Sequence, residues 1–185
     1  MKKEYEMNEI LKCIHERRSI KSYKSKMPST ELLDKVILAG LDAASGRNKQ
    51  GAIIVAVTDK SVRDALSETN AEILSSKAAI PGAASDPFYN APAVLVVLAD
   101  KSVNTSIYDA SLVAGNMMLA AHSLGLGSCW IHRARETFAT EKWQRWLRSI
   151  GIEGEYEGVA NIIVGYREGE FPPEKPRIPG RVFKV

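Results

Sequence analysis

The chain has 185 residues, 45% hydrophobic and 25% charged, a balance typical of one globular domain with a buried core. Its 25 basic and 22 acidic residues give a net charge of only +3, which argues against nucleic-acid binding because that function needs a concentrated basic face. The charged N-terminus lacks a signal-peptide core, and no apolar run approaches the roughly 18 residues of a membrane span, so we expect a soluble, cytoplasmic protein.

The two cysteines and three histidines offer little for disulfide or metal chemistry. Cys13 and Cys129 lie far apart in apolar surroundings, which favours two buried thiols in a reducing compartment. His15, His122 and His132 show no metal-ligand spacing, so no metal site is predicted. We expect His122 to be a core histidine whose polar atoms are satisfied.

The first third of the chain predicts two helices and a buried strand. Residues 7–15 place apolar side chains at positions i, i+3, i+4 and i+7, the period of an amphipathic helix. A Pro-Ser-Thr-Glu sequence then offers a hydroxyl cap for a second helix, predicted from about residue 30 to residue 43. A polar loop over 44–51 leads to a short apolar run at 53–57, which is typical of a buried strand.

The rest of the chain continues to alternate helices and strands. The predicted helices cover 59–77, 108–124 and 143–149, and the predicted strands cover 93–99, 126–131 and 159–165. Residues 80–90 contain two prolines and a glycine, so we expect irregular structure there. Because helices and strands alternate without repeats, the sequence predicts a mixed α and β class with one core.

The C-terminal segment differs in composition from the rest. From residue 166 the chain is charged and rich in proline, and it closes with a short strand-like sequence at 181–185. A strand-like end after an extended arm lies away from the compact body, which predicts that the arm docks on a partner subunit.

Two basic segments are candidates for anion binding. The first gathers three cations and a hydroxyl directly after the first predicted helix: Arg17, Arg18, Ser19 and Lys21. The second places a stiffening proline between Lys175 and Arg177. Guanidinium groups suit bidentate phosphate recognition, and the two segments would neutralise a phosphate dianion if they converged. Taken alone, each also fits a solvated surface, since the helix dipole favours cations at a C-terminal end.

Two further segments could contact a planar heterocycle. The loop at 45–50 is rich in amides, and Asn or Gln can both donate to and accept from an imide edge, although the loop also fits an ordinary turn. The glycines in 125–133 allow a ring to approach the backbone closely. Neither a G-x-G-x-x-G fingerprint nor a phosphate-loop motif occurs, which disfavours those nucleotide-binding folds.

The joint order of these motifs resembles the nitroreductase family of FMN enzymes. It runs from R-R-S-x-K through the 45–50 loop and the segment 116–131 to Gly-Tyr at 165–166 and Lys-Pro-Arg at 175–177. The resemblance spans nearly the whole chain and implies a single domain over 1–185 with an α+β, three-layer α/β/α fold. Helices would flank a mixed, mainly antiparallel sheet. It also implies a homodimer with FMN at the interface, in which an arm over about 166–185 exchanges its C-terminal strand with the partner.

The resemblance also implies roles for individual residues. The flavin phosphate and ribityl end would meet Arg17, Arg18, Ser19, Lys175 and Arg177. Lys21 would reach the pyrimidine side of the ring near N1 and O2, where its charge tunes the flavin. Donors from the partner subunit would be Ser45, Asn48 and Gln50. Asn70 would bind the isoalloxazine edge, and the backbone beside N5 would come from Ile131, His132 and Arg133.

The activity that the family implies is hydride transfer from NADH or NADPH, through flavin N5, to nitroaromatic, quinone or similar small-molecule acceptors in a ping-pong mechanism. The chain departs from many relatives by having Gly51-Ala52 where they have Pro-Trp, and by lacking the helical insertion that covers the active site in larger members. Alternatives are a specialised flavin enzyme (a dehalogenase, an azoline oxidase or a flavin-cleaving protein) or a non-catalytic flavin-binding or sensor protein. Phe88 and Tyr89 are candidates for lining the pocket over the flavin.

Overall fold

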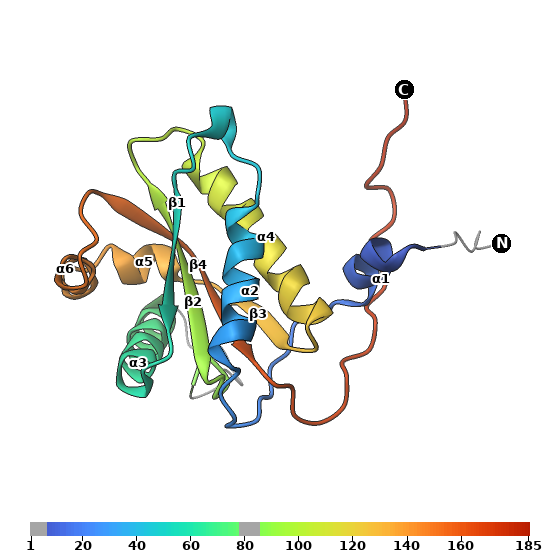
Figure 1. Ribbon diagram of the computed structural model, residues 1–185, viewed down its shortest axis with the longest axis horizontal. Coiled ribbons are helices and arrows are strands. Elements are labelled where there is room, and N and C mark those ends of the chain that lie inside the picture. The colour runs from blue at the N-terminus through green and yellow to red at the C-terminus, as the bar shows by residue number, and fades with distance from the viewer. Residues whose placement is uncertain (1–6, 78–85) are drawn as a thin grey trace.

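The computed structural model describes residues 7–77 and 86–185, which form one sheet with helices on both of its faces (Figure 1). The helices are α1 (Glu9–Glu16), α2 (Thr30–Leu41), α3 (Lys60–Lys77), α4 (Ser106–Ser123), α5 (Ala134–Phe138) and α6 (Glu141–Ser149), with a 3-10 turn η1 (Gly46–Asn48). The strands are β1 (Ala52–Val57), β2 (Ala93–Asp100), β3 (Gly127–Ile131) and β4 (Tyr156–Gly165).

The sheet has the strand order β1-β2-β4-β3, and each neighbouring pair is antiparallel. Helices α2 and α4 cover one face, and α3, α5 and α6 cover the other (Figure 1). The predicted three-layer α+β architecture is therefore confirmed. A parallel bridge between Ser19 and Ser128 lies outside the four strands.

Strand β2 shows why a sheet covered on both faces has an unbroken apolar sequence. Val94, Val96 and Leu98 point into the core formed with α3, α5 and α6, whereas Leu95 and Val97 point into the core formed with α2 and α4. All five side chains are fully buried. Because both faces exclude water, alternation with polar residues is absent, and the prediction of a buried strand at 93–99 is correct.

The sequence prediction missed some short or polar elements. Helix α5 was not predicted, because five residues are too few to show a helical period. Helix α6 begins at Glu141 instead of residue 143. Strand β4 begins at Tyr156 instead of residue 159, because its first three residues, Tyr-Glu-Gly, lack an apolar pattern. Of the segment expected to be irregular, 80–85 lies outside the described residues and 86–90 is a turn.

The apolar face of α1 is not covered by its own chain. Met7, Ile10, Leu11 and Ile14 are between 47% and 70% exposed. Cys13 is only half-buried and donates to the carbonyl of Leu119 at 3.5 Å, so the expectation that both cysteines are buried is wrong for this one. Amphipathic periodicity identifies the face of a helix but not the chain that covers it.

The C-terminal arm is extended, runs past α1, where Glu174 lies 3.7 Å from His15, and ends away from the rest of the chain (Figure 1). Residues 181–185 form no strand within this chain, and Val182 and Phe183 are 78% and 87% exposed. Strand exchange with a partner stays a prediction. None of the helices described in the structure is long and apolar enough to cross a membrane.

Candidate functional site

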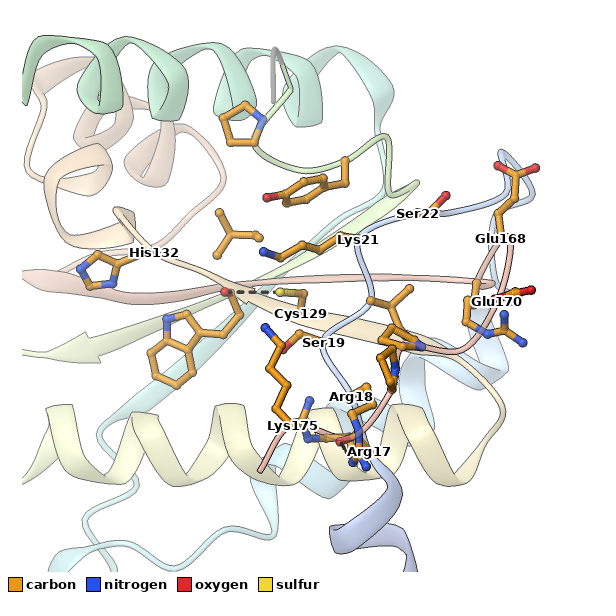
Figure 2. Close-up of a pocket in the computed structure, with 18 of the residues that line it drawn as sticks. Arg17, Arg18, Ser19, Lys21, Ser22, Cys129, His132, Glu168, Glu170 and Lys175 are labelled. Atoms are coloured by element: carbon orange, nitrogen blue, oxygen red, sulfur yellow. Dashed lines mark hydrogen bonds between the residues drawn. The ribbon is translucent and has the colours of Figure 1, made fainter. Parts of the chain in front are cut away.

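A cleft of about 1100 Å³ opens beside β3, one of the two edge strands of the sheet (Figure 2). Its walls come from the segment 17–22, helix α3, the turn at 86–90, β3 with the residues after it, and the C-terminal arm. Many of the residues singled out in the sequence line it: Arg17, Arg18, Ser19, Lys21, Asn70, Ile131, His132, Arg133, Lys175 and Arg177.

The segment 17–22 is held against the sheet by its backbone. Ser19 forms the parallel bridge with Ser128, and the amide of Ile20 donates to the carbonyl of Ser128 at 3.0 Å. The Ile20 side chain is buried in the core, and its neighbours Ser19 and Lys21 line the cleft. A Cβ on Gly127 would lie 2.9 Å from two carbons of the Ile20 side chain, and only glycine permits this close approach.

The beginning of the C-terminal arm is fastened to the same segment. The amide of Lys24 donates to the carbonyl of Tyr166 at 2.9 Å, and the amide of Glu168 donates to the carbonyl of Ser22 at 3.0 Å. The buried hydroxyl of Tyr23 donates to the carbonyl of Ile20 at 2.8 Å, and burial raises its pKa well above the usual range. The arm therefore leaves the sheet beside the segment 17–22. Its cations Lys175 and Arg177 line the same cleft as the basic residues of that segment.

Two buried guanidinium donors point to an anion in this part of the cleft. Arg17 Nη1 and Arg18 Nε are buried and have no hydrogen-bond partner among the residues that the structure describes. Arg18 Nη1 donates to the carbonyls of His15 and Arg17 at 2.6 and 3.0 Å, which fixes its side chain. Buried donors without acceptors are costly, and a phosphate supplies several acceptors at once. These residues therefore fit the phosphate of a nucleotide cofactor.

His122 lies at the margin of this basic region and not in the core as expected. It is partly exposed, and its ring centroid is 5.9 Å from that of Phe171 on the arm. Burial lowers its pKa, and the charges of Arg17 and Arg18 act in the same direction, against the opposing effect of Glu16. The imidazole therefore favours its neutral form beside the cationic cluster.

The opposite end of the cleft is rigid. Asn70 is 2% exposed, and its Nδ2 donates to the carbonyl of His132 at 2.8 Å, which ties α3 to the end of β3. Arg133 adopts a left-handed backbone with φ of 77° immediately before α5, and its Nη1 lies 2.9 Å from Glu136. The chain thus turns sharply away from the sheet and leaves the backbone of 131–133 along the cleft.

Lys21 and Tyr89 meet inside the cleft. The Nζ of Lys21 lies 5.5 Å from the centroid of the Tyr89 ring, which is a cation–π contact. Tyr89 lines the cleft as expected, whereas Phe88 is fully buried in the core and does not. Cys129 lies in the cleft wall; burial raises the pKa of its thiol, although Ser19 and Lys21 act in the opposite direction.

The three residues predicted from the loop at 45–50 do not reach the cleft of their own chain. Ser45, Asn48 and Gln50 hydrogen-bond one another around η1, and Gly46 binds Asp109 at the start of α4 at 3.0 Å. The cleft lies near the other end of α4, where β3 begins. A role for this loop at a flavin therefore requires a second copy of the chain.

Several cleft residues were not identified from the sequence. They include Ser22, Leu74, Trp130, Arg167, Glu168, Glu170, Pro172, Pro173 and Glu174. The prolines and glutamates belong to the C-terminal arm. Its composition is evident from the sequence, but its path back to the segment 17–22 is not, because it depends on contacts between residues far apart in the chain. Within 7–77 and 86–185, no group of three His, Cys, Asp or Glu side chains is arranged to hold a metal ion.

Comparisons with known proteins agree with this geometry. The model of the nitroreductase family matches residues 14–166. A curated protein of Archaeoglobus fulgidus is 30% identical over 172 residues, covering 89% of this chain and 88% of its own. An FMN reductase [NAD(P)H] of Bacillus subtilis is 27% identical over 94% of this chain and 71% of its own. A crystal structure of a Bacteroides fragilis nitroreductase with bound FMN superposes with a TM-score of 0.86 at 25% identity, covering 97% of this chain and all of the other.

Proposed function

The chain belongs to the nitroreductase family, so it is an FMN-dependent oxidoreductase that draws on NAD(P)H, and we propose that its electron acceptors are nitroaromatic, quinone or similar small molecules. The proposed cofactor site rests chiefly on one observation: two buried guanidinium donors that have no acceptor among the described residues lie in the cleft beside β3. Lys175 and Arg177 from the arm line the same cleft and add two further cations.

We propose that these side chains hold the phosphate and ribityl end of FMN. Arg17 and Arg18 supply guanidinium donors, and Ser19 supplies a neutral donor from a segment that the sheet holds rigid. Lys175 and Arg177 complete the neutralisation of the dianion. A rigid, prearranged set of donors binds an anion without paying for its own ordering.

The rigid end of the cleft fits the flavin ring. When bound, FMN supplies a ring that accepts a hydride at N5 and passes it on. Asn70 and the backbone of 131–133 orient the ring edge, and the ammonium of Lys21 stabilises the negative charge gained on reduction. A cleft that is open on one side admits nicotinamide and acceptor in turn, which leads to ping-pong kinetics.

We further propose that the working unit is a homodimer, in the cytoplasm. Apolar side chains of α1 and of the arm are exposed in the single chain, including Ile10, Ile178 and Phe183 at 67–87%. A second copy would cover them. It would also bring Ser45, Asn48 and Gln50 to the partner's flavin. Two unpaired cysteines suit a reducing compartment.

The purified protein tests this proposal directly. It should be yellow, release FMN on denaturation and elute as a dimer in size-exclusion chromatography with light scattering. A colourless monomer that takes up no added FMN would overturn the proposed function.

A further inference from the structure

The turn that carries Tyr89 has an unusual backbone. Tyr89 and Asn90 both have left-handed backbone angles, with φ of 51° and 56°. This region is unfavourable for a residue with a side chain, particularly a bulky one, and persists only where the surroundings impose it. The turn lies directly before Ala91 and strand β2, and it directs the Tyr89 ring into the cleft.

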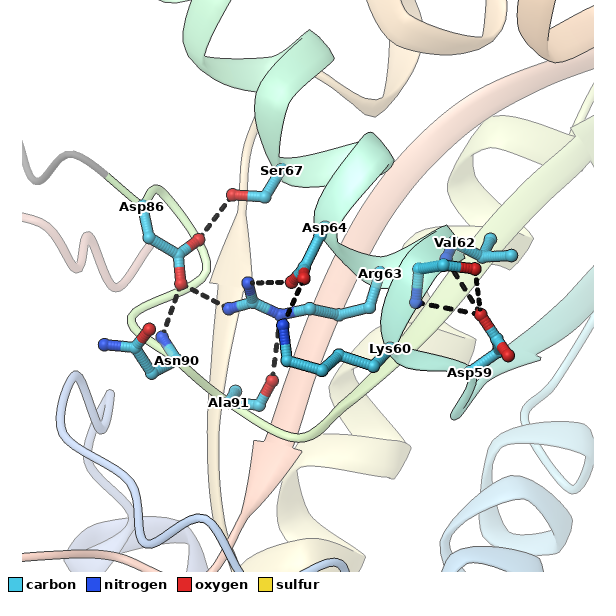
Figure 3. Close-up of polar contacts among 10 residues, drawn as sticks. Asp59, Lys60, Val62, Arg63, Asp64, Ser67, Asp86, Asn90 and Ala91 are labelled. Carbon is cyan, nitrogen blue, oxygen red and sulfur yellow. Dashed lines mark hydrogen bonds and ion pairs between the residues drawn. The ribbon is translucent and has the colours of Figure 1, made fainter.

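The carboxylate of Asp86 imposes this conformation from inside the turn. It accepts a hydrogen bond from the amide of Phe88 at 2.9 Å. It accepts a second from the amide of Asn90 at 2.6 Å (Figure 3), and these two residues flank Tyr89. It also accepts from the hydroxyl of Ser67 on α3. Burial alone would raise the pKa of Asp86, but its hydrogen bonds, above all from Arg63, outweigh burial and lower it.

Arg63 anchors the turn to α3 at two points. Its Nη2 pairs with Asp86, and its Nε donates to the carbonyl of Ala91 at 3.1 Å (Figure 3). The guanidinium also lies 5.6 Å from the Phe88 ring centroid, and Nη1 donates to Asp64 at 3.0 Å. Arg63 is only 7% exposed, so its pair with Asp86 is largely shielded from water, and we expect its geometry to be rigid.

The effect of this anchor reaches the cleft through Lys21. Lysine carries its charge on a flexible four-carbon stem, and an exposed ammonium samples many positions in water. The face of the Tyr89 ring offers it a favourable position 5.5 Å away, inside the cleft. The backbone that carries this ring is held on both sides of Tyr89 by Asp86 and Arg63.

We propose that Tyr89 is a positioning residue: held by the Arg63–Asp86 pair, its ring keeps the Lys21 ammonium in the cleft, where it raises the flavin reduction potential. The proposal rests on the proposed function, because Lys21 acts there on the pyrimidine side of FMN. It adds a residue and a structural support that no family motif in the sequence marks.

A redox titration of the FMN-loaded dimer tests the effect on the flavin. Tyr89→Leu removes the ring face and should lower the flavin potential, reducing the preference for reduced over oxidised FMN roughly two- to fivefold. Tyr89→Phe keeps the face and should restore the wild-type potential. Lys21→Ala should lower the potential further, and Tyr89→Leu should then add nothing, because its effect passes through Lys21.

Lys26→Ala is the matched control, since Lys26 forms a similar contact with Tyr166 at 5.3 Å but does not line the cleft. It should leave the potential unchanged. A potential that is equal in wild type and Tyr89→Leu, or that falls equally in Tyr89→Phe, would overturn the proposal.

A second measurement does not depend on FMN. In the full-length protein before FMN is added, the Tyr89 ring current should shift the NMR signal of the Lys21 methylene next to the ammonium. The shift should be lost in Tyr89→Leu, kept in Tyr89→Phe and reduced in Asp86→Asn. If the shift is absent in the wild type, the proposal is wrong; if the protein takes up no FMN but shows the shift, the proposed function fails while the positioning of Lys21 stands.

Discussion

The side-chain amide of Asn70 donates a hydrogen bond to the backbone carbonyl of His132 at 2.8 Å, and this bond fastens α3 to the end of β3. Asn70 is almost fully buried, so the bond is made away from water. Helix α3 also carries Arg63, which anchors the turn of Tyr89. One helix therefore fixes two walls of the cleft.

Removing the Asn70 bond should weaken both the fold and the site. Asn70→Ala leaves the His132 carbonyl without its partner and should lower the free energy of unfolding by about 1–3 kcal/mol. Asn70→Asp should cost at least as much at neutral pH, because a carboxylate cannot donate to a carbonyl. Urea unfolding at pH 7 measures both. Glu68→Ala, which alters an exposed residue of the same helix, should change the free energy of unfolding by no more than about 0.5 kcal/mol. Equal losses in all three variants would contradict a stabilising role of the Asn70–His132 bond.

The two arginines should act mainly on cofactor affinity. Arg17→Ala and Arg18→Ala each remove a charged donor from the phosphate region and should weaken FMN binding by about 1.5–3 kcal/mol, or roughly ten- to hundredfold. Fluorescence titration with FMN measures the dissociation constant. Arg145→Ala removes an exposed arginine on α6 and should not change it. FMN bound equally well by all three variants would place the phosphate elsewhere.

Gly127→Ala tests whether the 17–22 segment must lie against β3. The added Cβ would meet the Ile20 side chain at 2.9 Å, closer than ordinary packing allows, so the segment has to move. We expect the free energy of unfolding to fall by about 1–3 kcal/mol. FMN binding should also weaken, because Ser19 and Lys21 move with Ile20. Unchanged FMN affinity would mean that this segment does not form the cofactor site.

The Arg63–Asp86 pair should make stability depend on pH in acid. Hydrogen bonding holds the pKa of Asp86 below its ordinary value of 3.8, so its contribution is fully present above that value and is lost as pH falls through the lower folded-state pKa. Asp86→Asn should cost about 1–3 kcal/mol at pH 7. The difference from wild type should shrink below pH 4. Urea unfolding at pH 7, 5 and 3 measures it, and a difference independent of pH would contradict the ionic role of Asp86.

Local patterns in the sequence predicted the parts of the fold that depend on local physics. Strand β2 is an apolar run because both faces of the sheet are covered, whereas α4 buries one side in the core formed with α2 and leaves Tyr108 and Leu112 exposed. The glycine after α4 also proved informative: Gly125 follows the last turn of this helix with φ of 74°. The basic segment at 17–21 was recognised by composition, but its attachment to β3 depends on contacts more than a hundred residues apart.

What the sequence did not reveal lies in long-range contacts and in contacts with another chain. Arg63 and Asp86 are 23 residues apart, and nothing in either neighbourhood indicates that they pair. The same holds for the path of the arm, which brings Lys175 into the cleft that Arg17 also lines. Ser45 was placed at the flavin by family resemblance alone, and its position in a single chain leaves that role as a prediction.

Anaerobic stopped-flow mixing of the FMN-loaded protein with NADH or NADPH, followed by addition of a nitroaromatic or a quinone, tests the central claim most directly. The flavin absorbance should bleach with at least one of the two nucleotides. It should then return when the acceptor is added, in a second step whose rate does not depend on the nucleotide used. A protein that binds FMN but is not bleached by either nucleotide at a useful rate would contradict the enzyme assignment and leave a flavin-binding or sensor protein.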